Sequence, residues 1–325
     1  MNEYYFSLCG IHIQLSSVMP LIFVEPVEEF AFDTPEAFAE SFQISQKTEV
    51  DITGHSIAGD AKAECCKSVP CIEHYTIHTY SGILPQTGRK VYDCFRFQIY
   101  ADGDWQIYEY RVGNTINPYH ARLVLDPAVH DGVREHTLLL PEEYAPLITQ
   151  QMMFSSMLGF EPMSMWHGRI PMHAASVKLH DKVILFTGPS GMGKSTQSNL
   201  WIHYLNAQPV NGDKTILLPG EQDVRAYGSF YAGSSEIIHN ISGSVGAIIS
   251  LKQGPENIIH RLGISEAFRK IYPRFLVPQW DSAVTGYAME LIQRIVMTVP
   301  VYELECRPDE AAVQLAYKTI FETTE

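Results

Sequence analysis

Residues 188–195 have the sequence Gly-Pro-Ser-Gly-Met-Gly-Lys-Ser, which matches the spacing G-x-x-x-x-G-K-[ST]. Glycines in this pattern let successive backbone N–H groups turn toward one anion, and the start of the next helix adds a partial positive charge. The apolar run 183–187 predicts a buried strand, and 195–205 predicts a helix. A strand, this loop and a helix together predict an α/β fold around a polyphosphate site.

We expect the loop to hold ATP with Mg²⁺. In such loops the lysine, here Lys194, reaches the outer phosphates, and the hydroxyl of Ser195 can bind the metal. The alternative is a tight turn that binds no nucleotide. The predicted nucleotide-binding residues are Gly188, Ser190, Gly191, Met192, Gly193, Lys194, Ser195 and Thr196.

Charge and composition narrow the class of partner. The chain has 325 residues, a net charge of −14 and 46% hydrophobic residues, so we expect a globular protein of two domains. Nucleic acid and anionic membrane are not expected as partners, because both need clustered lysine and arginine. The sequence shows neither a signal peptide nor a membrane-length apolar run, which predicts a cytoplasmic protein.

Six cysteines are too few for a disulfide scaffold in a chain of this length. Cys65, Cys66, Cys71 and His74 lie within ten residues, which raises the alternative of a zinc site. Adjacent cysteines tend to point apart, however, and no second C-x-x-C pair accompanies them. We therefore favour reduced loop thiols over a metal site here.

The first half, residues 1–140, predicts an antiparallel β-rich domain. Its clearest signal is a hairpin, in which alternating residues 95–99 and the strand 105–110 flank an Asp-Gly-Asp turn. Residues 141–160 predict a helix, and the stretch from Gly159 to Gly168 predicts its end and a link. We place the linking segment at 141–164 and the second domain at 165–325.

The second domain predicts a mixed α/β fold. Its expected helices, after the one at 195–205, are 264–271, 280–297 and 308–321. Its expected strands are 171–179, 182–187, 209–210, 215–218, 224–227, 245–251, 257–262 and 301–305.

Two residues near the loop could supply acid–base chemistry. Asp213 ends a short apolar segment one helix after the loop, where its carboxylate could accept a proton from a hydroxyl acceptor and bind metal. His173 lies on the strand predicted to pair with the strand that leads into the loop, and it could hydrogen-bond Asp213 or a phosphate oxygen. The alternatives are an ordinary turn aspartate and a structural histidine.

The order and spacing of these motifs resemble the kinase domain of the HPr kinase/phosphorylase family, whose members share a phosphoenolpyruvate carboxykinase-like nucleotide fold. The resemblance covers residues 165–322. It rests on His-Ala-Ala-Ser-Val at 173–177, the loop at 188–196, Asn-Gly-Asp-Lys at 211–214, Ala-Tyr-Gly-Ser-Phe-Tyr-Ala-Gly at 226–233 and Cys-Arg-Pro-Asp at 306–309.

The resemblance implies that Asp213 activates a serine hydroxyl, with His173 as its partner, Lys194 as the phosphate clamp and Ser195 as a metal ligand. Two positions depart from the family pattern. Bifunctional members usually carry two aspartates where this chain has Gly212 and Asp213, and an acidic residue where it has Thr196. The resemblance therefore does not extend to the reverse, phosphate-removing reaction or to HPr as the acceptor.

Residues 5–13 are similar to the start of HPr-kinase-like enzymes of peptide-modifying systems, including lasso peptide kinases, which implies a peptide or small-molecule acceptor. Residues 227–239 resemble the family's acceptor-facing loop. The predicted acceptor residues are Gly228, Gly233 and Ser234, with Arg261, and after it Arg225 or Arg274, as the cation that stabilises the transferring phosphoryl group.

Three functions fit this sequence: a kinase for serine in a protein or peptide, a kinase for a free small molecule such as an amino acid, and a nucleotide-binding switch without catalysis. The first is favoured because of the loop together with Asp213 and His173. The sequence leaves open which molecule is the acceptor, whether ATP or another compound is the phosphate donor, and whether the chain forms a homo-oligomer.

Overall fold

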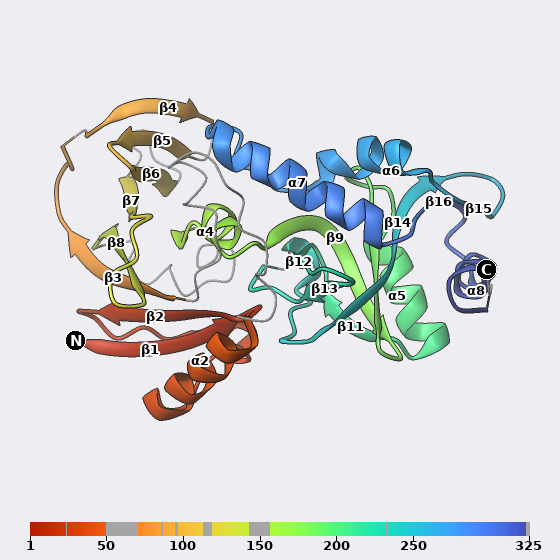
Figure 1. Ribbon diagram of the computed structural model, residues 1–325, viewed down its shortest axis with the longest axis horizontal. Coiled ribbons are helices and arrows are strands. Elements are labelled where there is room, and N and C mark those ends of the chain that lie inside the picture. Colours follow the sequence, from red (N-terminus) through yellow and green to blue (C-terminus); the bar gives the residue numbers. More distant parts are fainter. Residues whose placement is uncertain are drawn as a thin grey trace. The chain divides into compact units, whose positions relative to one another are not determined.

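The computed structural model describes residues 1–23, 25–49, 71–85, 87–94, 97–112, 119–142, 157–231 and 233–322. Contacts divide the chain into two compact units. One comprises Met1–His167 with Gln279–Ala283, and the other comprises Gly168–Pro278 with Val284–Glu325 (Figure 1). The architecture is mixed α/β. Among the described residues, no helix has both the length and the apolar composition needed to cross a membrane.

The first unit contains an eight-stranded sheet with the strand order β1-β2-β3-β8-β7-β6-β5-β4 (Figure 1). The strands are β1 (Asn2–Leu8), β2 (Ile11–Ser17), β3 (Ile72–Tyr80), β4 (Arg89–Asp93), β5 (Phe97–Asp102), β6 (Trp105–Val112), β7 (Tyr119–Leu125) and β8 (Val133–Pro141). The predicted hairpin is confirmed, since β5 and β6 pair antiparallel around the turn at 103–104.

The expectation of a purely antiparallel sheet is wrong, because β3 pairs parallel with both β2 and β8. Parallel neighbours need a long crossover connection. Residues 18–71 separate β2 from β3, and the strands β4 to β7 separate β3 from β8. Both connections are long enough to return the chain to the same end of the sheet, which makes the first sheet mixed.

Two helices in the connection after β2 were not predicted: α1 (Glu25–Glu28) and α2 (Pro35–Glu49). The start of α2 carries a recognisable signal, because Pro35 occupies the first turn and the hydroxyl of Thr34 accepts a hydrogen bond from the amide of Ala37 at 3.2 Å. The helix packs against β1 (Figure 1).

The stretch expected to end a helix does so, because Met157 is helical and is followed by a turn, and the same stretch also begins the next helix. Gly159 adopts a left-handed conformation (φ 59°) at the N-terminus of α4 (Phe160–Trp166). A Cβ atom at this glycine would lie 2.8 Å from Leu123 Cδ2, so the close packing requires glycine as well. Residues 143–156 of the predicted helix 141–160 lie outside the described part of the chain.

The second unit contains another eight-stranded sheet, with the path β10-β9-β12-β13-β14-β16-β15 and with β11 paired to β9. Its strands are β9 (Ile170–Leu179), β10 (Lys182–Thr187), β11 (Gln208–Asn211), β12 (Lys214–Pro219), β13 (Val224–Tyr227), β14 (Ser242–Gln253), β15 (Ile258–Arg261) and β16 (Val301–Cys306). Its α-helices are α5 (Lys194–Leu205), α6 (Ile264–Ile271), α7 (Ser282–Thr298) and α8 (Glu310–Tyr317). The predicted elements of this half are confirmed, with ends that differ by a few residues.

Five strands of the second sheet close into a ring of pairings. β10 pairs with β9, β9 with β12, β12 with β13, and β13 with β14, which pairs back in parallel with β10. The apolar residues 183–187 of β10 are all buried, as expected for a strand with neighbours on both edges. The loop that follows β10 is therefore attached to a buried strand that is paired on both edges.

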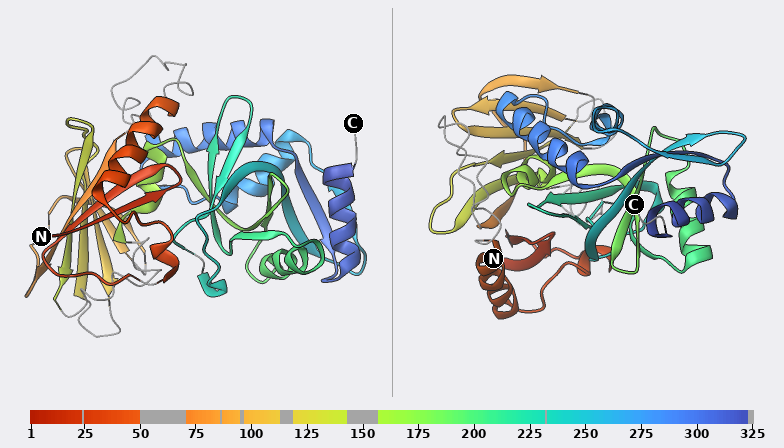
Figure 2. Two further views of the ribbon diagram at one scale, coloured as in Figure 1. Left: turned by 90° about the horizontal axis from the view of Figure 1, so that it is seen from below. Right: turned by 45° about the vertical axis from the view of Figure 1, so that its right-hand side comes forward.

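Helices α5 and α8 pack beside each other on one face of this sheet (Figure 2). Their common core with the sheet includes Phe186 of β10 and Trp201 of α5, whose rings meet edge to face with centroids 5.5 Å apart. Both side chains are fully buried. This contact fixes α5, and with it the loop that joins β10 to α5.

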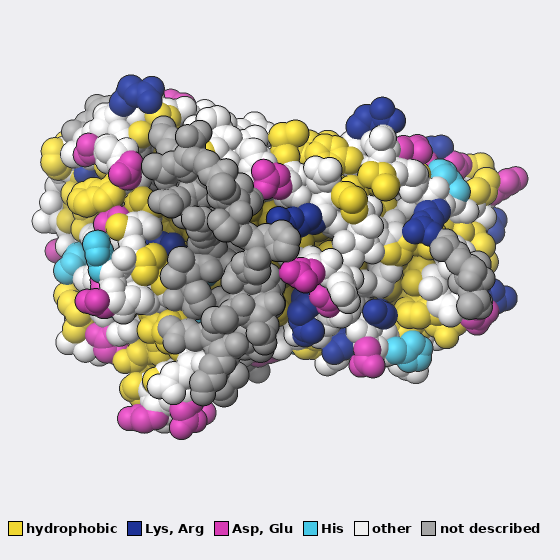
Figure 3. Space-filling view, in the orientation of Figure 1, with side chains coloured by type: hydrophobic (Ala, Val, Ile, Leu, Met, Phe, Trp, Pro, Cys, Tyr) yellow, Lys and Arg dark blue, Asp and Glu magenta, His cyan; other side chains and the backbone are white. Residues whose placement is uncertain are grey.

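On the face drawn in Figure 3, lysine and arginine side chains lie singly or in small groups beside acidic ones. The described residues of that face therefore carry interspersed positive and negative charges.

Replacing Phe186 with alanine should lower the free energy of unfolding by about 3–5 kcal/mol, because a large buried ring is lost beside Trp201. Urea unfolding followed by tryptophan fluorescence measures the change. Ile258 of the same sheet is 49% exposed, so Ile258→Ala is the control and should change stability by less than about 0.5 kcal/mol. Equal losses in the two variants would contradict the account of this core.

Candidate nucleotide and acceptor site

The glycine loop joins β10 to α5 through a backbone that ordinary residues rarely adopt. Gly191 and Gly193 have φ values of 77° and 97°. A Cβ atom at either glycine would meet no described heavy atom within 4 Å, apart from the adjacent residues, so backbone conformation and not space demands glycine. Pro189 and Ser190 are exposed at the tip of the loop.

Two side chains fasten the loop through its carbonyl oxygens. Gln253, at the end of β14, donates from Nε2 to the carbonyl of Gly191 at 3.1 Å. Lys194 donates from Nζ to the carbonyl of Gly188 at 3.4 Å. Neither bond uses a backbone N–H group of the loop, so the N–H groups at the start of α5 stay available as anion donors.

The side chains of His173 and Asp213 lie in contact across two neighbouring strands. The register pairs His173 of β9 with Lys214 of β12, and the amide of Ala174 donates to the carbonyl of Asp213 at 2.9 Å. His173 Nε2 lies 2.9 Å from Asp213 Oδ1. The two side chains are 36% and 24% exposed, which leaves them accessible to a bound molecule.

Lys194 belongs to the same neighbourhood as this pair. Burial lowers the pKa of Lys194, the negative charge of Asp213 raises it in part, and the positive charge of Arg274 lowers it further. Because both charges act on the ammonium group, the site gathers Asp213, Lys194 and Arg274 around the glycine loop. Two cations there favour an anionic guest.

The placement of Arg274 follows from backbone pairing. β10 stops pairing with β9 where Thr187 faces Ala174. Beyond that point Met172 of β9 bridges to Phe275, and the amide of Leu276 donates to the carbonyl of Pro171 at 2.9 Å. The 3-10 turn Tyr272–Arg274, directly before Phe275, also contacts β9 and so brings Arg274 to the part of β9 near which the glycine loop leaves the sheet.

Asn211 organises the backbone around Asp213. Its side chain is fully buried, and its Oδ1 accepts the amides of Asp213 at 2.9 Å and Lys214 at 2.7 Å. Its Nδ2 donates to the carbonyls of Ser229 at 3.1 Å and Tyr231 at 3.0 Å. One amide therefore holds Asp213 and the segment after β13 together, a role that local sequence did not reveal.

The predicted acceptor loop packs directly on this site. A Cβ atom at Gly233 would lie 3.0 Å from Asp213 Cγ, and one at Gly212 would lie 1.7 Å from Ser235 Oγ. A second aspartate at position 212 would not fit this arrangement. Position 228 requires glycine for a separate reason, because a Cβ atom there would lie 2.0 Å from the carbonyl oxygen of His239.

The other predicted acceptor residues are less closely tied to the glycine loop. The side chain of Ser234 lies outside the described part of the structure. Arg261 lies on β15, where it pairs with Tyr302 of β16. β15 is three strands away from β10 in the order β10-β14-β16-β15. Arg225 faces Ser244, whose other neighbour is Lys182 at the opposite end of β10 from the loop. Among the three arginines considered, Arg274 is the one whose charge acts on Lys194.

Residues for a nucleotide and a metal are present together. The exposed Ser195 and Thr196 begin α5, and the carboxylate of Asp213 supplies the hard oxygen that Mg²⁺ prefers. The positive charges of Lys194 and Arg274 fit a polyphosphate. This donor set fits Mg·ATP.

The four residues weighed as a zinc site are not brought together where the structure describes them. Cys65 and Cys66 lie outside the described residues. Cys71 and His74 differ by an odd number of positions at the start of β3 and so face opposite sides. His74 instead contacts Ser16 Oγ at 2.6 Å and Glu135 Oε2 at 2.7 Å.

Comparison with known proteins adds little to this geometry. No family model and no curated protein matches the chain. One solved structure to which it is similar is the Hpr(Ser) kinase/phosphatase from Coxiella burnetii, with 14% sequence identity, 47% of this chain and 93% of that chain covered, and a TM-score of 0.27. A TM-score this low carries no weight for fold or function.

Replacing Gly212 with alanine should destabilise the chain by about 1–3 kcal/mol, because the new methyl group overlaps Ser235. Adding Ser235→Gly should recover most of the loss, since it removes the overlapping atoms. Thermal unfolding of both variants measures this. Gly286→Ala, where a Cβ atom meets no described atom within 4 Å, is the control and should not destabilise. A lack of recovery in the double variant would contradict the packing described here.

Proposed function

We propose that this chain is an ATP-dependent kinase that transfers the γ-phosphoryl group to an alcohol hydroxyl, with serine of a protein or peptide as the acceptor. The observation that carries the proposal is the His173–Asp213 pair, 2.9 Å apart, beside the lysine of the glycine loop. A phosphate cradle alone fits many nucleotide-binding proteins. A cradle with an accessible carboxylate held by a histidine fits transfer to a hydroxyl.

In the proposed reaction Asp213 accepts the proton of the acceptor hydroxyl. The acceptor oxygen forms a bond to the γ-phosphorus, the bond from that phosphorus to the β–γ bridging oxygen breaks, and ADP leaves with the electron pair. Because His173 engages Oδ1 of Asp213, Oδ2 is the oxygen offered to the acceptor. Asn211 keeps the backbone of Asp213 in place during this step.

Lys194 and Arg274 stabilise the negative charge that spreads over the phosphoryl oxygens. Ser195 and Asp213 would hold Mg²⁺, which when bound neutralises phosphate charge. Gly233 lies against the carboxyl group of Asp213 and leaves room where a side chain would intrude. The segment that contains it is the part of this unit that we expect to contact the acceptor.

Asp213→Asn should lower phosphoryl transfer at least about 100-fold, because the amide cannot accept the proton. Measured without Mg²⁺, the affinity for an ATP analogue should stay within a few fold, because Asp213 contacts the nucleotide only through the metal and the transferred group. Transfer from radiolabelled ATP to a serine peptide library and to free hydroxyl compounds measures the rate. Asp181→Asn, in the exposed turn before β10, is the matched control. An Asp213→Asn variant with full activity would exclude this residue as the base. If the unmodified chain phosphorylated only free hydroxyl compounds and no peptide, the proposed acceptor would be wrong but the proposed kinase activity would stand.

Lys194→Ala should weaken binding of a non-hydrolysable ATP analogue with Mg²⁺ by about 10–100-fold, as expected when charge-assisted hydrogen bonds of about 1.5–3 kcal/mol are lost. Isothermal titration calorimetry measures the dissociation constants. The control is Lys182→Ala, because Lys182 lies at the end of β10 that is far from the glycine loop. This variant should bind the ATP analogue as the unmodified chain does. Equal affinities for all three chains would mean that the loop does not hold the phosphates.

A further inference from the structure

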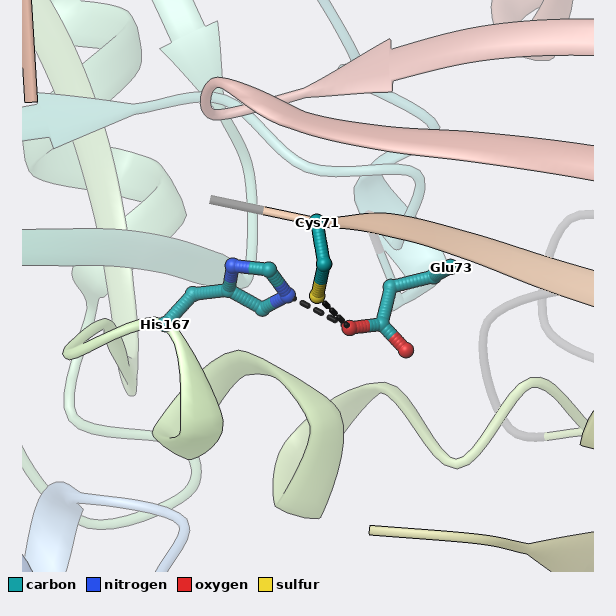
Figure 4. Close-up of side chains that lie close together, drawn as sticks. All are labelled: Cys71, Glu73 and His167. Atoms are coloured by element: carbon teal, nitrogen blue, oxygen red, sulfur yellow. Dashed lines mark hydrogen bonds and ion pairs between the residues drawn. The ribbon is translucent and has the colours of Figure 1, made fainter. Parts of the chain in front are cut away.

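A second cluster of reactive side chains lies in the first unit and has no part in the proposed kinase site. It centres on Glu73, which is fully buried, and includes Cys71 and His167, which are 2% and 3% exposed (Figure 4). Cys71 and Glu73 point to the same side at the start of β3, and His167 follows directly after α4. Residues almost a hundred positions apart therefore converge in the interior.

The three side chains present one sulfur, one oxygen and one nitrogen to the same point. Glu73 Oε1 lies 2.6 Å from His167 Nε2 and accepts a hydrogen bond from Cys71 Sγ at 3.5 Å. One ligand atom from each of the three lies within 4.8 Å of the others. Thiolate, imidazole and carboxylate are the donor types that bind zinc in proteins.

Two further buried residues hold the carboxylate in position. Arg134 forms an ion pair with Glu73. His136 Nδ1 accepts the backbone amide of Asp126 at 3.3 Å, so its Nε2 carries the proton and donates to Glu73 Oε2 at 2.5 Å. Partners that orient a ligand in this way are characteristic of built metal sites.

Glu73 is fully buried, and its two carboxylate oxygens face the ring nitrogens of His136 and His167. A charged carboxylate in the interior requires positive partners. Arg134 supplies that positive charge at Oε1, the oxygen that the thiol of Cys71 and the imidazole of His167 also approach.

We propose that Cys71, Glu73 and His167 bind one divalent ion of the zinc type inside the first unit. On binding, the thiol of Cys71 gives its proton to solvent, and neutral His167 carries its ring proton at Nδ1 instead of Nε2. The ion then links β3 to the segment after α4. It acts as a structural crosslink between these two segments.

The test is the metal content of the full chain, purified without a polyhistidine tag or chelator and measured by inductively coupled plasma mass spectrometry. We expect about one zinc per chain, and a loss of at least about tenfold in Cys71→Ser. Cys94→Ser, a half-buried cysteine outside the cluster, should keep its metal. A metal-free unmodified chain, or full occupancy in Cys71→Ser, would overturn the proposal.

A spectroscopic measurement covers the case in which Cys71→Ser fails to fold. The unmodified chain loaded with Co²⁺ should show a thiolate-to-cobalt absorption band, and the double variant Cys65→Ser/Cys66→Ser should show the same band. Bound cobalt without that band, or a band that disappears in the double variant, would exclude Cys71 as the thiolate ligand. Neither readout depends on kinase activity, so this proposal and the proposed function can fail separately.

Discussion

β9 lies between β10 and β12, and the site depends on this one placement. The glycine loop leaves the sheet where β10 stops pairing with β9, and Asp213 enters β12 beside His173 of β9. A phosphate-binding loop and a carboxylate some twenty residues later are thereby brought to the same end of the sheet. Separate loops on an unconstrained surface would not hold such groups within hydrogen-bonding range.

Local patterns in the sequence predicted the parts of the site that nearby residues determine. The apolar run before Gly188, the loop glycines and the helix after Lys194 are contiguous, and the two strands around the His180–Asp181 turn form a hairpin. The sequence named Asp213 as one possible partner of His173, and the pairing of β12 with β9 in the structure is what places the two residues side by side. The distance between the two side chains is what the structure adds.

Other features depend on contacts between distant residues, which no local pattern encodes. Arg274 is held near the site because its neighbour Phe275 forms a β-bridge with Met172, about a hundred positions away in the sequence. Asn211 is held there by hydrogen bonds to the segment at 229–231. The parallel pairings of β3 arise from long crossovers and not from the alternation within each strand. The cluster around Glu73 likewise joins β3 to the end of α4.

The two polar clusters differ in a way that matches their proposed roles. Glu73 is enclosed and its carboxylate is surrounded by donors, whereas Asp213 and His173 stay partly exposed with one carboxylate oxygen turned from the histidine. The most direct test of the account is a crystal structure with Mg²⁺ and a non-hydrolysable ATP analogue. It should show the β- and γ-phosphates on the amides of residues 190–195, with the carboxylate of Asp213 facing the γ-phosphorus opposite the leaving oxygen. A triphosphate bound elsewhere, or one in the loop with Asp213 turned away, would contradict it.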